Sequence, residues 1–415
     1  MSTVERRVEP GVGLAPNGPG EHGLESAVPR GLVDGPVYLD YNATTPVDPR
    51  VVAAMLPYFD THFGNPSSAH GFGAAPRAAL EVARDRVRGL IGARAGRVVF
   101  TGTGSEADAL AVGGVVAAAR AAGRVSPHVV TQVSEHPAVL AAVEAASRRL
   151  GARVTVLGVG TDGLVRPDEL RSALTADTVL VSIMHANNET GVIQPVAELA
   201  GIAHESGALF HTDAAQSVGK ISVDVARLGV DLLTLVGHKM YAPKGVAALY
   251  LRDEGLRLEP VVGGGGQEGG LRAGTENVPY AVGLGEAAVL AREELASGGP
   301  ERLARLRDLL HARLDAALPG RVELNGHPEQ RLPHVLNVSI EGIRSHELLE
   351  RCTGLAASAG SACHAGLHTP SPVLTAMGLP ADRGLSAVRL TLGRWTTEGD
   401  VTRAADILTR AVAAG

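Results

Sequence analysis

Short apolar runs alternate with alanine-rich stretches through the middle of the chain. The apolar runs predict seven strands, at 97–101, 128–133, 153–159, 178–185, 209–213, 232–236 and 246–251. The stretches between several of them predict helices at 105–120, 137–150, 167–174 and 195–206. Continuously apolar strands separated by helices are typical of a mainly parallel sheet that is covered on both faces. The expected fold class is therefore α/β.

The pattern changes after Tyr280, where a second and smaller α+β unit is expected. Its predicted elements are helices at 281–295, 301–318, 346–352 and 398–412, strands at 321–324, 335–340 and 387–392, and a loop around 360–369. Residues 1–35 are rich in Gly and Pro without apolar periodicity, which predicts a disordered extension. We expect a large domain over 36–290 and a small domain over 291–415, with residues 36–50 packing against the small domain.

Composition excludes several classes of protein. The chain has 415 residues, of which 45% are hydrophobic and 20% charged, as in ordinary globular proteins. A formal net charge of -6 argues against nucleic acid as a direct partner. The longest apolar run, Leu110 to Ala119, is too short for a membrane span. No secretory signal opens the sequence, and its 2 cysteines cannot build a disulfide framework, so a cytoplasmic location is expected.

Only three lysines are present, and one of them follows a buried strand. Lys239 comes directly after the strand at 232–236, where partial desolvation would lower its pKa and favour a nucleophilic amine. Lys244 and Lys220 lie in turn-like sequences and are expected to be solvated charges. Any chemistry that needs an amine nucleophile therefore points to Lys239.

Three other polar segments follow predicted strands. Gly102-Thr-Gly104-Ser105 precedes a helix and resembles a phosphate cradle, although a tight turn without a ligand explains it equally. Ser182 to Gly191 ends in an Asn-rich turn, and Asp213 ends the strand at 209–213, where it is either a helix cap or a functional acid. Together a phosphate cradle, a Lys and an Asp at strand ends are the parts of a pyridoxal phosphate (PLP) site.

A cysteine lies among small residues near the C-terminus. Cys363 stands in Ser-Ala-Gly-Ser-Ala-Cys-His, which indicates an accessible thiol, and neighbouring His residues would favour its thiolate. Cys363, His364 and His368 lack a fourth partner, so no metal site is predicted. Cys352 is interpreted as structural.

These segments resemble one family closely. The chain is similar to fold-type I, class V aminotransferase-like PLP enzymes of the cysteine desulfurase and selenocysteine lyase group. The matching segments, in the family's order from about residue 37 onward, are Tyr38–Pro46, Gly64–Ser68, Ser134–His136, His185–Gly191, His211–Gln216, Gly237–Lys239, Arg272–Asn277, Gly360–Cys363 and Val388–Arg394.

The resemblance implies a role for each matching residue. Lys239 would hold PLP as a Schiff base and move the substrate α-proton, and Cys363 would take the substrate sulfur as a persulfide. For the cofactor, the implied contacts are Asp213 at the ring nitrogen, His136 stacked on the ring, Gln216 and Asn188 near the ring hydroxyl, and Gly104, Ser105, His238 and a partner subunit's Thr275 at the phosphate. Asn42, Asn188 and Arg389 would contact the substrate, with Arg389 taking its carboxylate.

The expected protein is thus a homodimeric enzyme that converts L-cysteine to L-alanine and passes sulfur to an acceptor or scaffold protein, for iron–sulfur clusters or another thio-cofactor. Two departures from the usual pattern, Val236 in place of Ser and Gly104-Ser105 in place of Ala-Thr, leave selenocysteine lyase as an alternative. A transaminase of the same fold and a non-catalytic scaffold are further alternatives.

Overall fold

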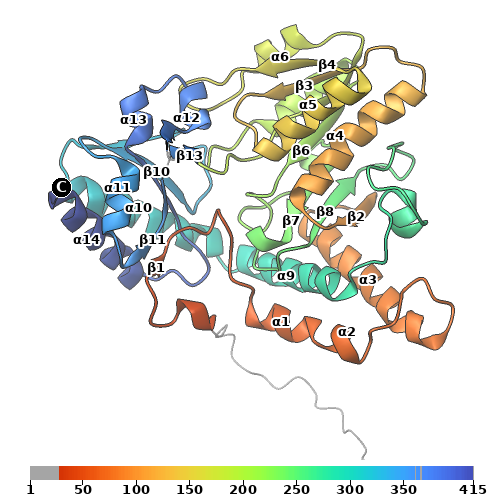
Figure 1. Cartoon of the computed structure of the whole chain (residues 1–415), viewed down its shortest axis with the longest axis horizontal. Coiled ribbons are helices and arrows are strands. Elements are labelled where there is room, and N and C mark those ends of the chain that lie inside the picture. The colour runs from red at the N-terminus through yellow and green to blue at the C-terminus, as the bar shows by residue number, and fades with distance from the viewer. Residues whose placement is uncertain (1–27, 360, 365–366, 415) are drawn as a thin grey trace, which may run out of the picture.

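The computed structural model describes residues 28–359, 361–364 and 367–414 (Figure 1). Residues 1–27 of the expected disordered extension lie outside this part. Residues 28–35 belong to it, and η1 (Arg30–Leu32) is a 3-10 turn in which the Leu32 N–H donates to the Pro29 carbonyl at 2.9 Å. The regular chain therefore begins before residue 36, because a local hydrogen bond closes this Gly- and Pro-containing segment.

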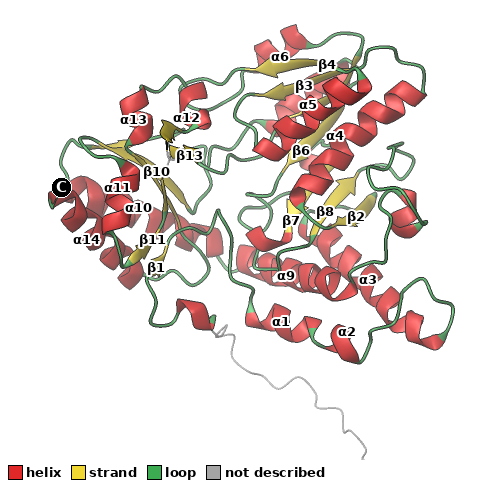
Figure 2. Cartoon of the chain, in the orientation of Figure 1, coloured by secondary structure: helices red, strands yellow, loops and turns green. Residues whose placement is uncertain are grey.

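A seven-stranded sheet forms the centre of the larger part of the molecule (Figure 2). In spatial order its strands are β2 (Arg97–Thr101), β8 (Ala247–Leu251), β7 (Leu232–Val236), β6 (Leu209–Asp213), β5 (Thr178–Ser182), β3 (His128–Gln132) and β4 (Arg153–Leu157). The run from β7 to β4 is parallel, whereas β8 is antiparallel to both its neighbours. The predicted mainly parallel α/β sheet is confirmed.

Helices cover both faces of this sheet because successive strand residues point to opposite sides. Val129 packs with α4 and α5, whereas Val130 packs on the other side with α3, α7 and α9. The bounds of these helices are α3 (Gly71–Leu90), α4 (Gly104–Ala121), α5 (Pro137–Leu150), α7 (Val196–Glu205) and α9 (Val278–Ala296). Shorter helices flank them: α1 (Pro49–Met55), α2 (Pro57–Asp60), α6 (Pro167–Ala173) and α8 (Val225–Leu228).

A second sheet with its own apolar core lies beside the large one (Figure 1). Its strands are β12 (Ser358–Ala359), β15 (Ala387–Thr391), β10 (Val335–Ile340) and β9 (Val322–Leu324), all antiparallel. The helices of this region are α10 (Gly299–Ala317), α11 (Ser345–Arg351), α12 (Pro372–Ala376), α13 (Ala381–Leu385) and α14 (Glu398–Ala413). The expected boundary between residues 290 and 291 falls inside α9, which packs on the large sheet. We therefore propose that the small unit begins after α9.

The segment near the start of the described chain crosses to this second unit. β1 (Val37–Tyr38) pairs in parallel with β11 (Leu355–Ala356), and Leu39 belongs to the small core. Figure 1 shows this early segment, in red, against the blue C-terminal elements. The chain then returns to the large unit at α1, so residues between β1 and α1 run between the two cores.

Cys363 lies in a strand that pairs with a second strand, where a loop was expected around 360–369. β13 (Ser361–His364) pairs in antiparallel register with β14 (Leu367–Pro370), so that the backbone of Cys363 lies opposite His368. Backbone pairing satisfies the N–H and C=O groups of this small-residue sequence, which has no apolar alternation that would have predicted strands. Among the described residues, none of the helices is both long and apolar enough to cross a membrane.

Candidate active site

Lys239 lies at the C-terminal end of β7, in the 3-10 turn η2 (Gly237–Lys239). Its Nζ donates to the carbonyl oxygen of Asn42 at 2.5 Å and to that of Ala43 at 2.9 Å. Burial, followed by the charge of Arg389, lowers the pKa of Lys239 to about 8. With this pKa about one tenth of the amine is free at pH 7, far more than for an ordinary lysine, and free amine is the form that attacks a carbonyl carbon.

Asp213 ends the neighbouring strand β6 and shares this edge of the sheet with Lys239. One carboxylate oxygen accepts the Ala215 N–H at 2.9 Å. Burial raises the pKa of Asp213, while the charges of His136 and Lys239 act in the opposite direction. A cation placed against Asp213 would therefore be balanced by its ionised form.

His136 is the N-cap of α5, with its Nδ1 accepting the Ala138 N–H at 3.2 Å. Desolvation lowers the pKa of His136, which favours the neutral ring. A neutral imidazole whose rotation is limited by this hydrogen bond is a suitable surface for stacking an aromatic ring.

The N-terminus of α4 provides the expected anion cradle. Thr103 caps the helix by accepting the Glu106 N–H at 3.0 Å, and Ser105 is exposed in the first turn. A Cβ on Gly104 would lie 2.5 Å from Cγ2 of Val236, so the glycine lets the helix approach the end of β7. Backbone N–H groups at such a helix start attract a phosphate dianion.

His238 borders the same region. Its Nδ1 lies 3.1 Å from the hydroxyl of Thr44, and burial lowers the pKa of His238 to about 4. The neutral ring can donate one hydrogen bond to a phosphate oxygen.

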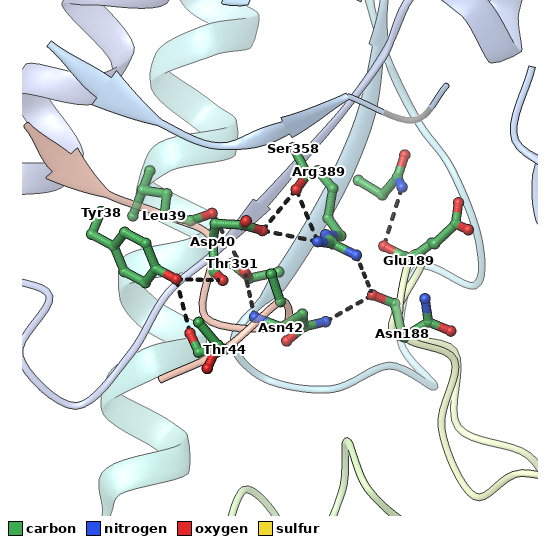
Figure 3. A network of polar contacts seen from close by, with 12 residues as sticks. Tyr38, Leu39, Asp40, Asn42, Thr44, Asn188, Glu189, Ser358, Arg389 and Thr391 are labelled. Carbon is green, nitrogen blue, oxygen red and sulfur yellow. Dashed lines mark hydrogen bonds and ion pairs between the residues drawn. The ribbon is translucent and has the colours of Figure 1, made fainter. Parts of the chain in front are cut away.

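The predicted substrate residues form a connected hydrogen-bond network between the two sheets (Figure 3). Asn42 Nδ2 donates to the Asn188 carbonyl at 3.0 Å, and Arg389 Nη1 donates to the same oxygen at 3.1 Å. Gln216 Nε2 reaches the carbonyl of Asn42 at 3.2 Å. Lys239 donates to the Asn42 carbonyl as well. Asn42 therefore connects the amine of Lys239 with the Asn188 carbonyl, which also accepts from the guanidinium of Arg389.

Thr275 and Cys363 are two predicted residues that no described side-chain contact places beside the others. Thr275 is exposed, on the chain that follows the 3-10 turn η3 (Gln267–Gly270). Cys363 is placed by its backbone in β13, and its side chain lies outside the described part of the structure. Their predicted roles stay predictions.

Several buried ionisable groups near the site were not singled out from the sequence. Asp108 is 2% exposed, lies 3.8 Å from His211 Nε2, and has a pKa raised well above the usual range by burial. Burial also raises the pKa of Glu135 to about 8. The charge of Asp213 also contributes to raising the pKa of both acids. In the sequence, each acid was only a carboxyl close to a junction between a strand and a helix.

The expectation that Lys220 is solvated is wrong. Its side chain is 6% exposed, and the Nζ atom lies 4.2 Å from the ring centre of Tyr241. Burial lowers the pKa of Lys220 to about 7. The turn sequence Ser-Val-Gly-Lys resembles a surface turn, but the aromatic ring replaces part of the lost hydration of the amine. Lys244 is exposed, as expected.

Within the described ranges, no group of three or more His, Cys, Asp or Glu side chains is placed to hold a metal ion. The site is instead built from the Lys239 amine, buried carboxyl groups and the N-terminus of α4.

Comparison with known proteins identifies the family. Residues 37–404 match the family described as aminotransferase class-V. The chain belongs to this family. It is 47% identical over 368 residues to "Cysteine desulfurase IscS" of Anaeromyxobacter dehalogenans, which covers 88% of this chain and 90% of the relative.

Solved structures agree with this assignment. A "NifS-like protein" superposes with a TM-score of 0.83 at 34% identity, over 92% of this chain and 100% of that one. A structure titled "SspA in complex with cysteine" gives 0.75 at 34% identity, over 87% and 99% of the two chains. The predicted fold type I architecture and the resemblance to the cysteine desulfurase group are confirmed.

Proposed function

We propose that this protein is a PLP-dependent cysteine desulfurase, which converts L-cysteine to L-alanine and retains the sulfur on Cys363. The observation that carries the proposal is the partly desolvated amine of Lys239 beside the Asp213 carboxyl, at the sheet edge where α4 begins. The names of the relatives favour cysteine over selenocysteine as the substrate, and favour desulfuration over transamination.

The residues present fit the cofactor. Among the described residues, Lys239 Nζ donates only to backbone carbonyls and forms no salt bridge that would hold the amine protonated. Asp213 would hold a proton on the ring nitrogen, Gln216 and Asn188 would contact the ring hydroxyl, and His136 would cover the ring. Gly104, Ser105 and His238 would hold the phosphate. PLP supplies an electron sink that weakens the bonds at the substrate α-carbon.

Each protein group has a definite task in the reaction. Arg389 would bind the substrate carboxylate, and Lys239 Nζ would take the α-proton. Asn42 would hold Asn188, whose carbonyl also accepts from Arg389. The Cys363 thiolate would attack the substrate sulfur, so that an S–S bond forms while the C–S bond breaks. The β-carbon from which the sulfur leaves gains a proton, and the α-carbon regains its own. The balanced result is alanine plus a persulfide on Cys363.

The resemblance to cysteine desulfurases implies a homodimer, and exposed apolar side chains support one here. Large apolar side chains are exposed together on α1, α2 and the chain up to α3: Val52 at 42%, Leu56 at 58%, Phe59 at 56%, Phe63 at 63% and Phe72 at 64%. The rings of Phe63 and Phe72 lie 5.7 Å apart, and exposed apolar side chains that gather in this way mark an interface. The exposed Thr275 would reach a partner's phosphate site. An acceptor or scaffold protein for the sulfur, and a cytoplasmic location, remain predictions.

Product formation tests the function. Purified protein loaded with PLP is incubated with L-cysteine and, separately, with L-selenocysteine, and alanine is quantified by chromatography. We expect alanine from cysteine, together with a mass increase of one sulfur on Cys363. Turnover of selenocysteine without turnover of cysteine would reassign the enzyme as a selenocysteine lyase. Pyruvate in place of alanine would indicate a different reaction.

A further inference from the structure

The guanidinium of Arg389 is held by two oxygens from segments far apart in the chain (Figure 3). Its Nη2 donates to Asp40 Oδ1 at 2.8 Å and to the Ser358 hydroxyl at 3.0 Å. The Ser358 hydroxyl in turn donates to the same Asp40 oxygen at 2.8 Å. The three residues thus form a closed triangle of hydrogen bonds.

Each corner of the triangle is fixed by backbone structure. Asp40 follows β1 and forms a bridge to Thr391, two residues after Arg389. Ser358 in β12 pairs with Arg389 in β15. The side chains of Arg389 and Asp40 are 13% and 21% exposed, so solvent screens their attraction only in part.

Several N–H donors of Arg389 already have acceptors with which a carboxylate ligand has to compete. A guanidinium has five N–H donors: two on each Nη and one on Nε. Nη2 already donates to both Asp40 and Ser358, and Nη1 donates to the Asn188 carbonyl, whereas the buried Nε has no partner among the described residues. Either two-pronged contact with a carboxylate needs Nη2, together with Nε or with Nη1. A bidentate carboxylate therefore competes with Asp40 and Ser358 for Nη2.

We propose that Asp40 and Ser358 are positioning residues for Arg389, and that the substrate carboxylate takes the place of the Ser358 hydroxyl on Nη2. The hydroxyl is the weaker partner, because it is neutral whereas Asp40 is charged. After exchange Ser358 still donates to Asp40, so no polar group is stranded. Asp40 stays on Nη2 and keeps the guanidinium aimed at the substrate.

This inference rests on the proposed function, in which Arg389 binds the substrate carboxylate. It predicts opposite effects on carboxylate affinity for substitutions at Ser358 and at Asp40. Removing the Ser358 hydroxyl removes a competitor, so carboxylate affinity rises. Removing the Asp40 side chain releases the guanidinium from its fixed position, so carboxylate affinity falls. A purely structural role for these residues predicts that both changes weaken binding.

The test compares two amines that differ only in the carboxylate. L-Alanine and ethylamine are titrated into the PLP-loaded protein, and binding is followed by the change in visible absorbance. We expect Ser358→Ala to bind L-alanine about threefold more tightly and Asp40→Ala to bind it about tenfold more weakly. Ethylamine affinity should not change in either variant. Ser358→Thr restores a hydroxyl and should return L-alanine affinity to the wild-type value.

The control is Thr402→Ala, which removes an exposed hydroxyl of the small unit that donates to the Glu398 carbonyl at 3.0 Å. It should leave both affinities unchanged. Weaker L-alanine binding by Ser358→Ala, or equal changes for both amines, would overturn the inference while leaving the proposed function intact. A wild-type protein whose absorbance responds to neither amine would instead contradict the proposed function.

Discussion

Gly104 and Val236 are complementary in shape: the missing side chain of one makes room for a methyl group of the other, since a Cβ at Gly104 would lie 2.5 Å from Val236 Cγ2. The first residue of α4 and the last of β7 thereby come together beside the proposed phosphate site. Gly104 and Val236, one residue from each departure from the usual desulfurase sequence, are thus one structural adjustment.

This contact predicts that the two positions are energetically coupled. Gly104→Ala should destabilise the protein by about 1–3 kcal/mol through overpacking and should weaken PLP binding. Val236→Ser removes the obstructing methyl, so Gly104→Ala combined with Val236→Ser should recover most of the loss. Denaturant unfolding and fluorescence titration with PLP measure both effects. Strictly additive changes in the double variant would contradict the contact.

Asp213 should be required for chemistry more than for folding. Asp213→Asn keeps the shape but cannot hold a proton on the ring nitrogen by charge, so kcat for alanine formation should fall about 100-fold or more. Asp406→Asn, at an exposed position on α14, is the matched control. Retention of near wild-type kcat by Asp213→Asn would remove Asp213 from the proposed role.

Cys363 should separate binding from sulfur transfer. Cys363→Ser is expected to show the same absorbance change with L-alanine as the wild type but to form no alanine from cysteine. Cys352 is 1% exposed, so Cys352→Ala serves as the control and should retain turnover. Full activity in the Cys363 variant would favour a transaminase.

Lys220 gives the protein a pH-dependent stability that can be isolated. Burial lowers its pKa from 10.5 to about 7, so between these values the unfolded chain binds the extra proton. The free energy of unfolding therefore rises with pH across this window as far as Lys220 is concerned. Lys220→Met should flatten that rise, and its stability relative to wild type should be greatest below pH 7.

Urea unfolding of both proteins at about pH 6 and about pH 9 provides the measurement. Lys244→Met, at an exposed lysine, is the control and should leave the pH dependence as in the wild type. If the free energy of unfolding depends on pH in the same way in the wild type and in Lys220→Met, burial does not lower the pKa of Lys220.

Local sequence patterns predicted the sheet well but predicted some helices poorly. β6, β7, β10 and α5 have the predicted bounds, because unbroken apolar runs between turn residues leave few alternatives. No element was predicted between residues 50 and 96, where α3 carries Pro76 inside the helix. A proline and early glycines conceal the periodicity, and packing against α9 stabilises the helix in spite of them.

Prediction of the site residues from the sequence was limited in the same way. Lys239 and Asp213 could be selected because Asp213 ends a buried strand and Lys239 follows one closely, which is a local signal. The burial of Lys220 depends on the ring of Tyr241, and the triangle of Asp40, Ser358 and Arg389 joins three distant segments. Contacts between such distant positions carry no local pattern, so they became visible only in the fold.

The central claim is that Lys239 binds the cofactor covalently. The protein is incubated with PLP, treated with borohydride, digested and analysed by peptide mass spectrometry. With only three lysines in the chain the assignment is unambiguous, and we predict a phosphopyridoxyl group on Lys239 alone. A label on Lys220 or Lys244, or no label on any lysine, would contradict the account.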